Sequence, residues 1–496
     1  MHSYHIFYFP FKWEVKGKEN LLFSEQVNLK KIIVNPYSNW DRTFECVNEI
    51  QKDELYNEKQ YFYKFTHPIL YDDGTTDSII RHYEHKDPKS GDTRYIIKKK
   101  DGKLYSLKLD AISLNLYSTG VGILNFYLEN NDYPDKEDVL VINQFGRRIF
   151  PPFIQDTESR IEIAEYIEIQ GLSGTRSYRE DFSDYTNQTP DRLASFIESL
   201  ITDFSDNIEI EPVIDDRMFV NSTYSNKTLV EPFSCFDDQN QEAIDKSEEA
   251  FQKFCFEESF WYKYLFIDAS SPTCRNKAMR NKLVEDHTYL RWQQYGSLFG
   301  FSRYSLVLLA DINQDNDYLP VHMRCMYSRM IEMVLITRAS ILKFSGETTE
   351  VSKLINVEKP DRDLINRISS IYKEYIGFVN QYYFREVTAQ DQGIELYNLM
   401  LRTLRINDYT KDLDNEIEEL HNYVSLLEDN RRNTNATYLN IFVVILTIIT
   451  VITGLSSINY LLICSIFQQF RWLEISIGLA VCILGIIIFL KFFPFS

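Results

Sequence analysis

Two apolar stretches near the C-terminus decide the fold of this chain: YLNIFVVILTIITVITGLSS at 438–457 and WLEISIGLAVCILGIIIFLKFF at 472–493. The first carries no charged residue, and the second carries only Glu474 and Lys491, one near each end. Each has about 20 residues, which at ~1.5 Å of rise per residue cross a hydrocarbon core ~30 Å thick. Because backbone polar groups in such a core must be satisfied within the segment, we predict two transmembrane helices.

The residues before these stretches are numerous enough for two or three folded units, since the chain has 496 residues. Hydrophobic residues make up 44% of the sequence and aromatic residues 15%, which is ample for packed cores. We expect a mixed α/β domain over 1–235, a helical region over 236–360, stalk helices over 361–437 and a transmembrane domain over 438–496. The predicted class is an α+β cytoplasmic domain with a long helical stalk and two C-terminal transmembrane helices.

Charge and cysteine usage narrow the partners and the compartment. The net charge of −19 argues against nucleic acid as the main partner, because phosphate binding needs a basic footprint. The seven cysteines include no CxxC pair, which is typical of reduced thiols in a cytosolic body. The N-terminus lacks the pattern of a signal peptide, and Arg431 and Arg432 precede the first span. We therefore expect a multi-pass protein of the inner cell membrane, with the N-terminal domain and the C-terminus in the cytoplasm.

Strand signals gather in the first third of the chain. RYIIKKK at 94–100 and KLYSLKL at 103–109 flank an Asp-Gly turn, which predicts a hairpin. Alternating residues at 111–117 and 121–130, joined by Thr119-Gly120, predict two more strands. The stretch 139–153 is compatible with a strand or a short helix that stops at Pro151.

Helical spacing dominates later in the chain, at 189–203, 240–266, 274–299 and 319–345. Beyond Pro360 apolar residues fall on heptad a and d positions at Ile406, Leu413, Ile417, Leu420, Val424 and Leu427. The same register continues through the first span to Leu455. The pattern predicts an unbroken helix that leads from the stalk through the first span and packs along one seam.

Polar residues form a stripe beside this seam. At 100° per residue one arc of the helix holds Asn433, Asn440, Thr447, Thr450, Gly454 and Ser457. Polar side chains at membrane depth usually face protein or water, which favours a pore lined by several copies. The alternative is that the hydroxyl groups bond back to carbonyls of their own helix.

Basic residues at two places suggest a site for a small anionic ligand. Arg147 and Arg148 follow what is expected to be a strand. Arg275, Lys277 and Arg280 cluster near a helix start, and Arg291 stands beside Trp292, with Arg303 further on. Arginine forms bidentate contacts with phosphate, and helix N-termini favour anions. The alternative is ordinary ion pairing with the many acidic residues.

Catalytic motifs are missing from the sequence. It contains no GxxxxGK[ST], GxSxG or HExxH, and its eight histidines make no i, i+4 ligand pair. Asp215-Asp216-Arg217 is a lone acidic pair, better explained as structural. We therefore predict no catalytic residue, no metal site and no enzymatic activity.

The layout of a long helix, a first span, a short loop and a C-terminal second span resembles the CorA family of metal-ion channels. The stretch 430–454 is similar to that family's entry into its first span, and 291–309, 322–345 and 384–400 are similar to a bacterial CorA-like branch with an enlarged cytoplasmic domain. The resemblance implies a CorA-like funnel of five copies with a central pore. It also implies either a nucleotide signal or Mg²⁺ as the ligand.

One departure from the family affects the expected ion. The family's Gly-Met-Asn filter is replaced by Gly454-Leu455-Ser456-Ser457, and the loop 458–471 contains no Asp or Glu. A hydrated divalent cation would lose its polar filter and its acidic ring. The leading hypothesis is therefore a homo-oligomeric channel gated by its cytoplasmic domain, as in membrane effectors of type III CRISPR antiviral systems. The alternatives are a divergent divalent-cation transporter and a non-conducting, membrane-tethered scaffold.

Overall fold

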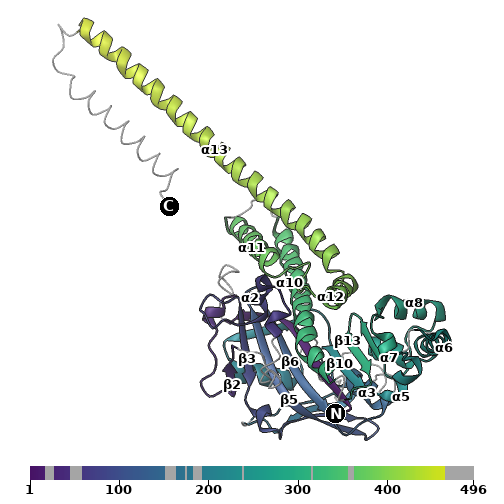
Figure 1. Cartoon of the computed structure of the whole chain (residues 1–496). Coiled ribbons are helices and arrows are strands. Elements are labelled where there is room, and N and C mark those ends of the chain that lie inside the picture. Colours follow the sequence, from purple (N-terminus) through teal and green to yellow (C-terminus); the bar gives the residue numbers. More distant parts are fainter. Residues whose placement is uncertain are drawn as a thin grey trace. The chain divides into compact units, whose positions relative to one another are not determined.

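A computed structural model describes most of the chain (Figure 1). The described residues are 1–16, 27–44, 58–150, 163–173, 176–182, 193–236, 239–313, 317–355 and 362–463. The chain divides into two units, Met1–His421 and Asn422–Ser496. The first unit is a mixed α/β body, and the helix α13 (Ile406–Ile463) begins in it and continues past the boundary.

The strands of the described residues belong to one 13-stranded sheet with a main path in the order β11-β12-β13-β10-β1-β6-β5-β4-β7-β8. Off this path β2 pairs with β3, β3 with β5, and β9 with β1. The strands are β1 (Ser3–Val15), β2 (Trp40–Arg42), β3 (Ile80–His85), β4 (Arg94–Lys99), β5 (Leu104–Tyr117), β6 (Val121–Asn130), β7 (Ala164–Gln170), β8 (Arg179–Asp181), β9 (Ile208–Pro212), β10 (Phe219–Ser225), β11 (Thr288–Tyr289), β12 (Ser297–Phe301) and β13 (Ser305–Ala310). Neighbours pair antiparallel except β10 and β13, which are parallel.

Helices cover this sheet and lead out of it. They are α2 (His67–Leu70), α3 (Lys136–Phe145), α4 (Ser195–Phe204), α5 (Lys227–Val230), α6 (Gln241–Gln252), α7 (Phe260–Phe266), α8 (Lys277–His287), α9 (Tyr318–Arg324), α10 (Met326–Ile355), α11 (Arg362–Gln381), α12 (Asp391–Thr403) and α13. The strands β11, β12 and β13 lie within 236–360, so this largely helical part of the chain also supplies one end of the sheet.

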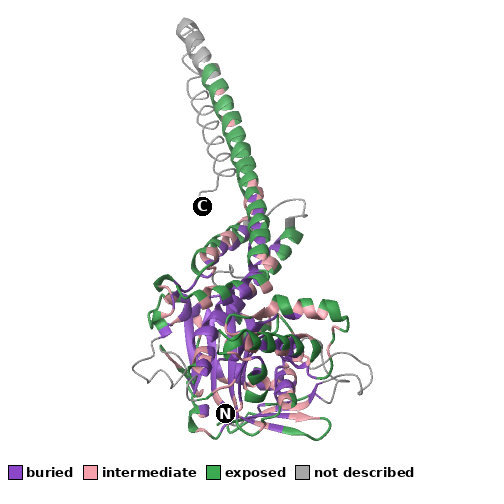
Figure 2. Cartoon of the chain, turned by 45° about the vertical axis from the view of Figure 1, so that its right-hand side comes forward, coloured by how far each residue is buried: buried purple, intermediate pink, exposed green. Residues whose placement is uncertain are grey.

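The two faces of the sheet meet different helices. On β6, Asn125 donates from Nδ2 to Oε1 of Glu332 on α10 at 2.9 Å, while the next residue, Phe126, packs against Phe196 of α4. This alternation follows from the two-residue period of a strand. On β1, Tyr8 bonds Ser328 of α10, and His5 bonds Asn143 of α3. The sheet is therefore buried between α10 on one side and α3 and α4 on the other (Figure 2).

The predicted hairpin is confirmed in β4 and β5, whose register pairs Arg94 with Lys108. Gly102 takes a φ of 92°, which glycine adopts without the Cβ clash of other residues. The strands predicted at 103–109 and 111–117 are one continuous strand, β5, with a register shift at Asp110. The strand predicted at 121–130 is confirmed as β6.

Several element predictions need correction. The strand option for 139–153 is wrong, because α3 ends at Phe145 and is capped by the Asp135 side chain, which accepts from Glu137 N. The stretch 240–266 is broken between α6 and α7. Of 274–299 only Lys277–His287 is α-helical; Thr288–Tyr289 forms β11, Gln293–Tyr295 is a single 3-10 turn and β12 begins at Ser297. The predicted start of the helix at 189–203 lies outside the described residues, and α4 begins at Ser195.

The last helices agree better with the pattern of the sequence. α10 packs on α11, where Phe344 meets Tyr375 and Phe378 with ring centroids 5.7 and 5.6 Å apart. α13 is one helix of 58 residues, as predicted. Its seam residues Ile406, Leu413, Ile417 and Leu420 are buried. The heptad prediction for the start of the stalk is thus confirmed.

One helix among the described residues is long and apolar enough to cross a membrane, and that helix is α13. None of its most apolar window is buried inside the structure, and Tyr438, Ile441, Ile445 and Ile448 are each about half exposed or more. The second predicted span, 472–493, lies outside the described residues. Figure 2 shows this segment of α13 exposed on its sides up to Val451.

Candidate functional site

A break in the pairing of β1 places the candidate site. On one edge β1 pairs with β10 as far as Tyr8 and with β9 from Phe11 onward. Pro10 lies at this change of partner, and strands tolerate proline at such irregular positions because it has no N–H for the ladder. The chain from β9 to β10, residues 213–218, therefore arches away from β1.

The space beside this arch is a pocket of about 170 Å³, lined by Pro10, the connection between β9 and β10, and residues of α10. Four arginines line it: Arg147, Arg217, Arg303 and Arg338. We call it the arginine pocket. Its members come from four places in the sequence: the end of α3, the β9–β10 connection, the β12–β13 turn and the middle of α10.

Arg147 is the most deeply buried of the four, with an exposed fraction of 2%. Its Nη1 donates to the Met218 carbonyl at a long 3.5 Å, and its guanidinium lies 5.3 Å from the Tyr304 ring centroid. Its Nε has no hydrogen-bond partner among the described residues. Burial, together with the charge of Arg217, lowers the pKa of Arg147 to about 10, so the group still carries its charge at neutral pH.

Arg338 enters the pocket from α10 and is also short of partners. Its buried Nε–H donates to no group among the described residues. Burial and then the charge of Arg303 lower the pKa of Arg338 from its usual value. Each arginine thus experiences the repulsion of another, which is the signature of positive charge gathered without enough counter-charge.

Two carboxylates lie at the pocket, and one of them is already paired. Asp216 contacts Arg217 at 3.3 Å and Arg148 at 3.2 Å. Asp215 lines the pocket, and desolvation together with the neighbouring Asp216 raises the pKa of Asp215 to about 6. Both carboxylates carry most of their charge at neutral pH, but the four lining arginines outnumber them, so the site is positive in a chain whose net charge is −19.

The residues predicted to bind an anion separate in the structure. Arg147 lies in the pocket, while its neighbour Arg148 contacts Asp216 beside it. Both follow helix α3, so the prediction that they end a strand is wrong. Arg275, Lys277 and Arg280 lie at and near the start of α8 and do not line the pocket.

Arg291 forms ordinary ion pairs, which was the alternative explanation for the basic residues. Its Nη1 lies 2.5 Å from Glu395 Oε1 and its Nη2 lies 3.8 Å from Asp391. Sequence reasoning missed Arg217 and Arg338 as members of a site. A signal for Arg338 was present, since it interrupts the apolar run MVLIT–ASIL of a buried helix.

The start of α13 does not line the pocket, but it lies close enough to Arg338 to influence its pKa. Tyr409, in the first turns of α13, contributes to the electrostatic environment of Arg338. Arg405, the residue before α13, holds a φ of 54°, a left-handed conformation that is rare for a residue with a side chain. Its guanidinium lies 5.2 Å from the Tyr409 ring centroid and its Nε 3.1 Å from Asp408. The root of α13 is therefore defined by a small cluster of charged and aromatic groups.

The predicted pore residues lie along α13. Asn433, Asn440, Thr447 and Thr450 are exposed. Thr447 donates to the Val443 carbonyl at 2.8 Å and Thr450 to the Leu446 carbonyl at 2.7 Å. In a single chain these hydroxyls are thus satisfied by their own helix. Gly454 and Ser457 belong to the end of α13, where only the backbone is described.

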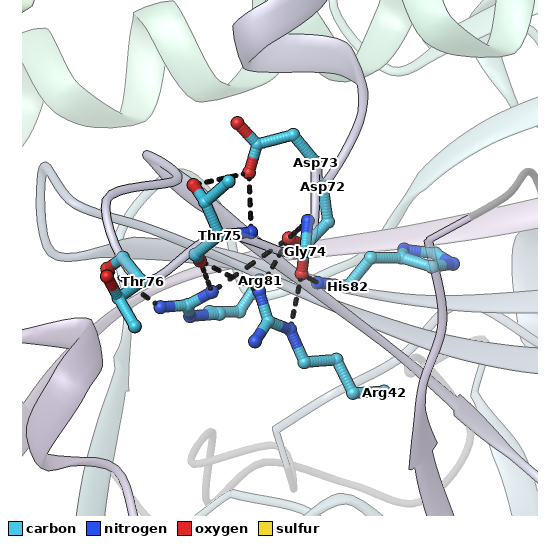
Figure 3. A network of polar contacts seen from close by, with 8 residues as sticks. All are labelled: Arg42, Asp72, Asp73, Gly74, Thr75, Thr76, Arg81 and His82. Atoms are coloured by element: carbon cyan, nitrogen blue, oxygen red, sulfur yellow. Dashed lines mark hydrogen bonds and ion pairs between the residues drawn. The ribbon is translucent and has the colours of Figure 1, made fainter.

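A second gathering of arginines has a different character (Figure 3). Asp72 is buried, and Arg42 donates to both of its oxygens, at 2.7 Å from Nε and 2.6 Å from Nη2. Arg81 lies 3.9 Å from the same carboxylate and donates to the carbonyls of Thr75 and Thr76. The Gly74 and His82 backbone N–H groups complete the shell. We call this the Asp72 network.

Within the described ranges no group of three or more His, Cys, Asp or Glu side chains could hold a metal ion. A scan of protein-family models and a search of curated proteins each found no match to the chain.

Proposed function

We propose that this chain forms a CorA-like homo-oligomeric membrane channel, with five copies expected, whose large α/β body controls its opening. The observation that carries the proposal is α13. One continuous helix begins in the buried seam of the body and continues into a segment with a mean hydropathy of 1.8, none of which is buried by the part of the chain that the structure describes. The proposal rests on this helix and on the resemblance.

The exposed segment of α13 needs a covering. Large apolar side chains at 438–451 are about half exposed, and an apolar surface of this extent is unfavourable in water. Lipid would cover the outward sides. The heptad register places Ile441, Ile445 and Ile448 on one seam, which other copies of α13 would cover. Asn440, Thr447 and Thr450 would then lie beside that seam and face the axis.

Ion flux through the full chain in liposomes tests the proposal. We expect the wild type to conduct ions once its body is activated, and Thr447→Leu to reduce the flux several-fold by making the pore wall apolar. Ile449→Leu is the matched control, because residue 449 lies about 160° away from Thr447 on the helix and should leave flux unchanged. An absence of flux under every condition, or equal flux in the wild type and Thr447→Leu, would contradict the pore.

A membrane-tethered scaffold is the second candidate, and the backward bonds of Thr447 and Thr450 favour it. Those bonds let a single α13 lie in lipid with its hydroxyls satisfied, without a pore. A protein that stays monomeric in membranes and never conducts would support this candidate. Steady magnesium flux without any signal would instead support the divalent-cation transporter.

The biological role we propose, antiviral defence in a type III CRISPR system, is supported by the resemblance alone. Defence genes beside the coding gene would support it, and a neighbourhood of magnesium-homeostasis genes would count against it.

A further inference from the structure

We infer that the arginine pocket is a binding site for a small anion that carries one or two phosphoryl groups, and that Arg338 transmits its occupancy to the root of α13. The binding and its effect on the root of α13 stand without the proposed function, whereas any consequence of that effect for pore opening rests on it. Two observations carry the inference: the deep burial of Arg147 without a carboxylate partner, and the convergence of four guanidinium groups on one cavity.

The positive charge of the arginine pocket favours binding of an anion. Among the described residues no carboxylate lies within ion-pair distance of Arg147, Arg303 or Arg338. A buried charge is costly unless it is paired and hydrogen-bonded. The chain supplies little counter-charge, because Asp216 already contacts Arg148 and Arg217, and among the pocket-lining residues only Asp215 remains to face four guanidinium groups. A bound anion would supply what the chain does not.

Arginine chemistry and pocket size select the class of anion. A guanidinium is a planar fork of N–H donors that matches the oxygens of a phosphoryl group, and several forks can share one tetrahedral oxyanion. The pocket of about 170 Å³ has room for roughly five or six waters at about 30 Å³ each. One or two phosphoryl groups fit that space, and a larger ligand would have to extend through the opening beside the exposed residues Arg303 and Tyr304.

Internal ion pairing is the alternative, and the geometry favours it less. Arg291 shows what pairing looks like in this chain, with a carboxylate oxygen at 2.5 Å. In the pocket Arg147 and Arg338 instead present buried Nε–H groups with no described acceptor. Donors of this kind that face a cavity are arranged for a ligand rather than for a neighbouring side chain.

Arg338 connects this site to α13. It lies in the middle of α10 and lines the pocket, and Tyr409 of α13 influences its pKa. α10 also reaches α13 through α11, because Phe344 of α10 meets the ring of Tyr375, whose hydroxyl donates to Asp414 of α13 at 2.5 Å. Arg405, with its left-handed backbone, stands over the Tyr409 ring and precedes α13 directly. An anion that neutralises Arg338 changes the field at Tyr409, one turn from this conformationally constrained residue. Residues 404–412 are thus the segment expected to respond.

Pyrophosphate binding to the full chain in detergent tests the site, with inorganic phosphate as a smaller probe. We expect pyrophosphate to raise the unfolding temperature of the wild type in a saturable manner, because it binds the folded state. Arg303→Gln and Arg338→Gln should each weaken binding about tenfold, as expected for loss of a charged hydrogen bond. Arg275→Gln removes the same charge from a residue just before α8, outside the pocket lining, and should bind like the wild type. Arg303 is exposed, so its variant should fold even if a buried arginine proves essential for folding.

Equal binding by all four proteins, or no binding by the wild type, would overturn the site. The link to α13 has its own readout, which does not depend on conduction. Hydrogen exchange at 404–412 should slow in the wild type with pyrophosphate and stay unchanged in Arg338→Gln. Binding without any change in exchange would overturn the link and leave the site standing. A slowed exchange with no ion flux would contradict the proposed channel while supporting both the site and the link.

Discussion

The Asp72 network and the arginine pocket both place arginines against the same sheet. The arginines of the network are paired with a carboxylate, whereas Arg147 of the pocket is not. In the Asp72 network Arg42 and Arg81 surround one buried carboxylate, and their remaining donors reach backbone carbonyls. In the arginine pocket Arg147 is equally buried but contacts a ring and a distant carbonyl. Burial alone therefore does not distinguish a structural arginine from a ligand-binding one, whereas the presence of a partner does.

Asp72→Asn removes the carboxylate that pairs with Arg42 and Arg81, and we expect it to lower the free energy of unfolding more than any other substitution considered. Removing the negative charge leaves two guanidinium groups without their partner, and loss of one member of a buried pair costs about 3–5 kcal/mol. Denaturant unfolding of the variant would measure the change in free energy. Asp73→Asn is the matched control, because Asp73 is exposed and bonds Thr75 only locally. Equal stabilities of the two variants would show that the Asp72 network is not structural.

His5 sharpens the comparison with a buried group that carries no charge. Burial lowers the pKa of His5 to about 4, below the 6.5 of the unfolded chain. As the pH falls from 6.5 to about 4, His5 becomes protonated in the unfolded state but stays neutral in the folded state. The free energy of unfolding therefore falls across this window. The loss from this group is about 3 kcal/mol.

Unfolding measured at a series of pH values would test this. His5→Gln should flatten the fall in stability between pH 6.5 and 4, and His2→Gln, just before the strand, should leave the slope as it is. Parallel curves for the wild type and His5→Gln would contradict the assignment.

Arg147→Met tests the arginine that has no carboxylate partner, and here we expect stability to rise rather than fall. Without an anion the variant should be more stable than the wild type by about 1–2 kcal/mol, because an unpaired buried charge is replaced by an apolar side chain of similar length. With pyrophosphate only the wild type should gain stability. Denaturant unfolding without pyrophosphate measures the change in stability caused by the substitution, and unfolding with pyrophosphate measures the gain from binding. A variant that is strongly destabilised without the anion would mean that Arg147 has a structural role like that of Arg42.

Arg405→Gly should have the smallest effect on stability. Glycine adopts a φ of 54° without strain, but it loses the contacts to Asp408 and Tyr409. These contributions nearly cancel, leaving a change within about 1 kcal/mol. The response of hydrogen exchange at 404–412 to pyrophosphate should nevertheless weaken. An undiminished response would show that the constrained backbone of Arg405 is not needed for the link.

Local chemistry made some elements predictable from the sequence. The Asp101-Gly102 turn fixed the β4–β5 hairpin, and the heptad from Ile406 fixed the start of α13, because both depend on residues close in sequence. The helix expected at 274–299 failed beyond His287 because pairing with distant strands overrode helical spacing. β1 was not predicted, since its role is visible only when β6, β9 and β10 are in place.

The site was predictable only in part for the same reason. The basic neighbourhood of Arg147 indicates an anion site, and Arg303 follows the second group of basic residues along the chain. Arg217 and Arg338 are separated by 121 positions (338 − 217) in the sequence, and only the packing of α10 on the sheet brings them to one cavity. A spacing rule cannot find such a set, because no two of its members share an element.

The place of β1 also governs when this protein can fold. It is synthesised before the strands that it pairs with, and its partners include Tyr224, paired with Ser3, more than two hundred residues later. At about 5–20 residues per second, the ribosome needs on the order of ten to forty seconds to supply that partner. During this time the β10 edge of this aromatic strand waits unpaired, although β6 can already cover its other edge. The apolar segment of α13 at 438–451 is made later still, so the sheet can close before that segment leaves the ribosome, which would suit the insertion that we propose for it.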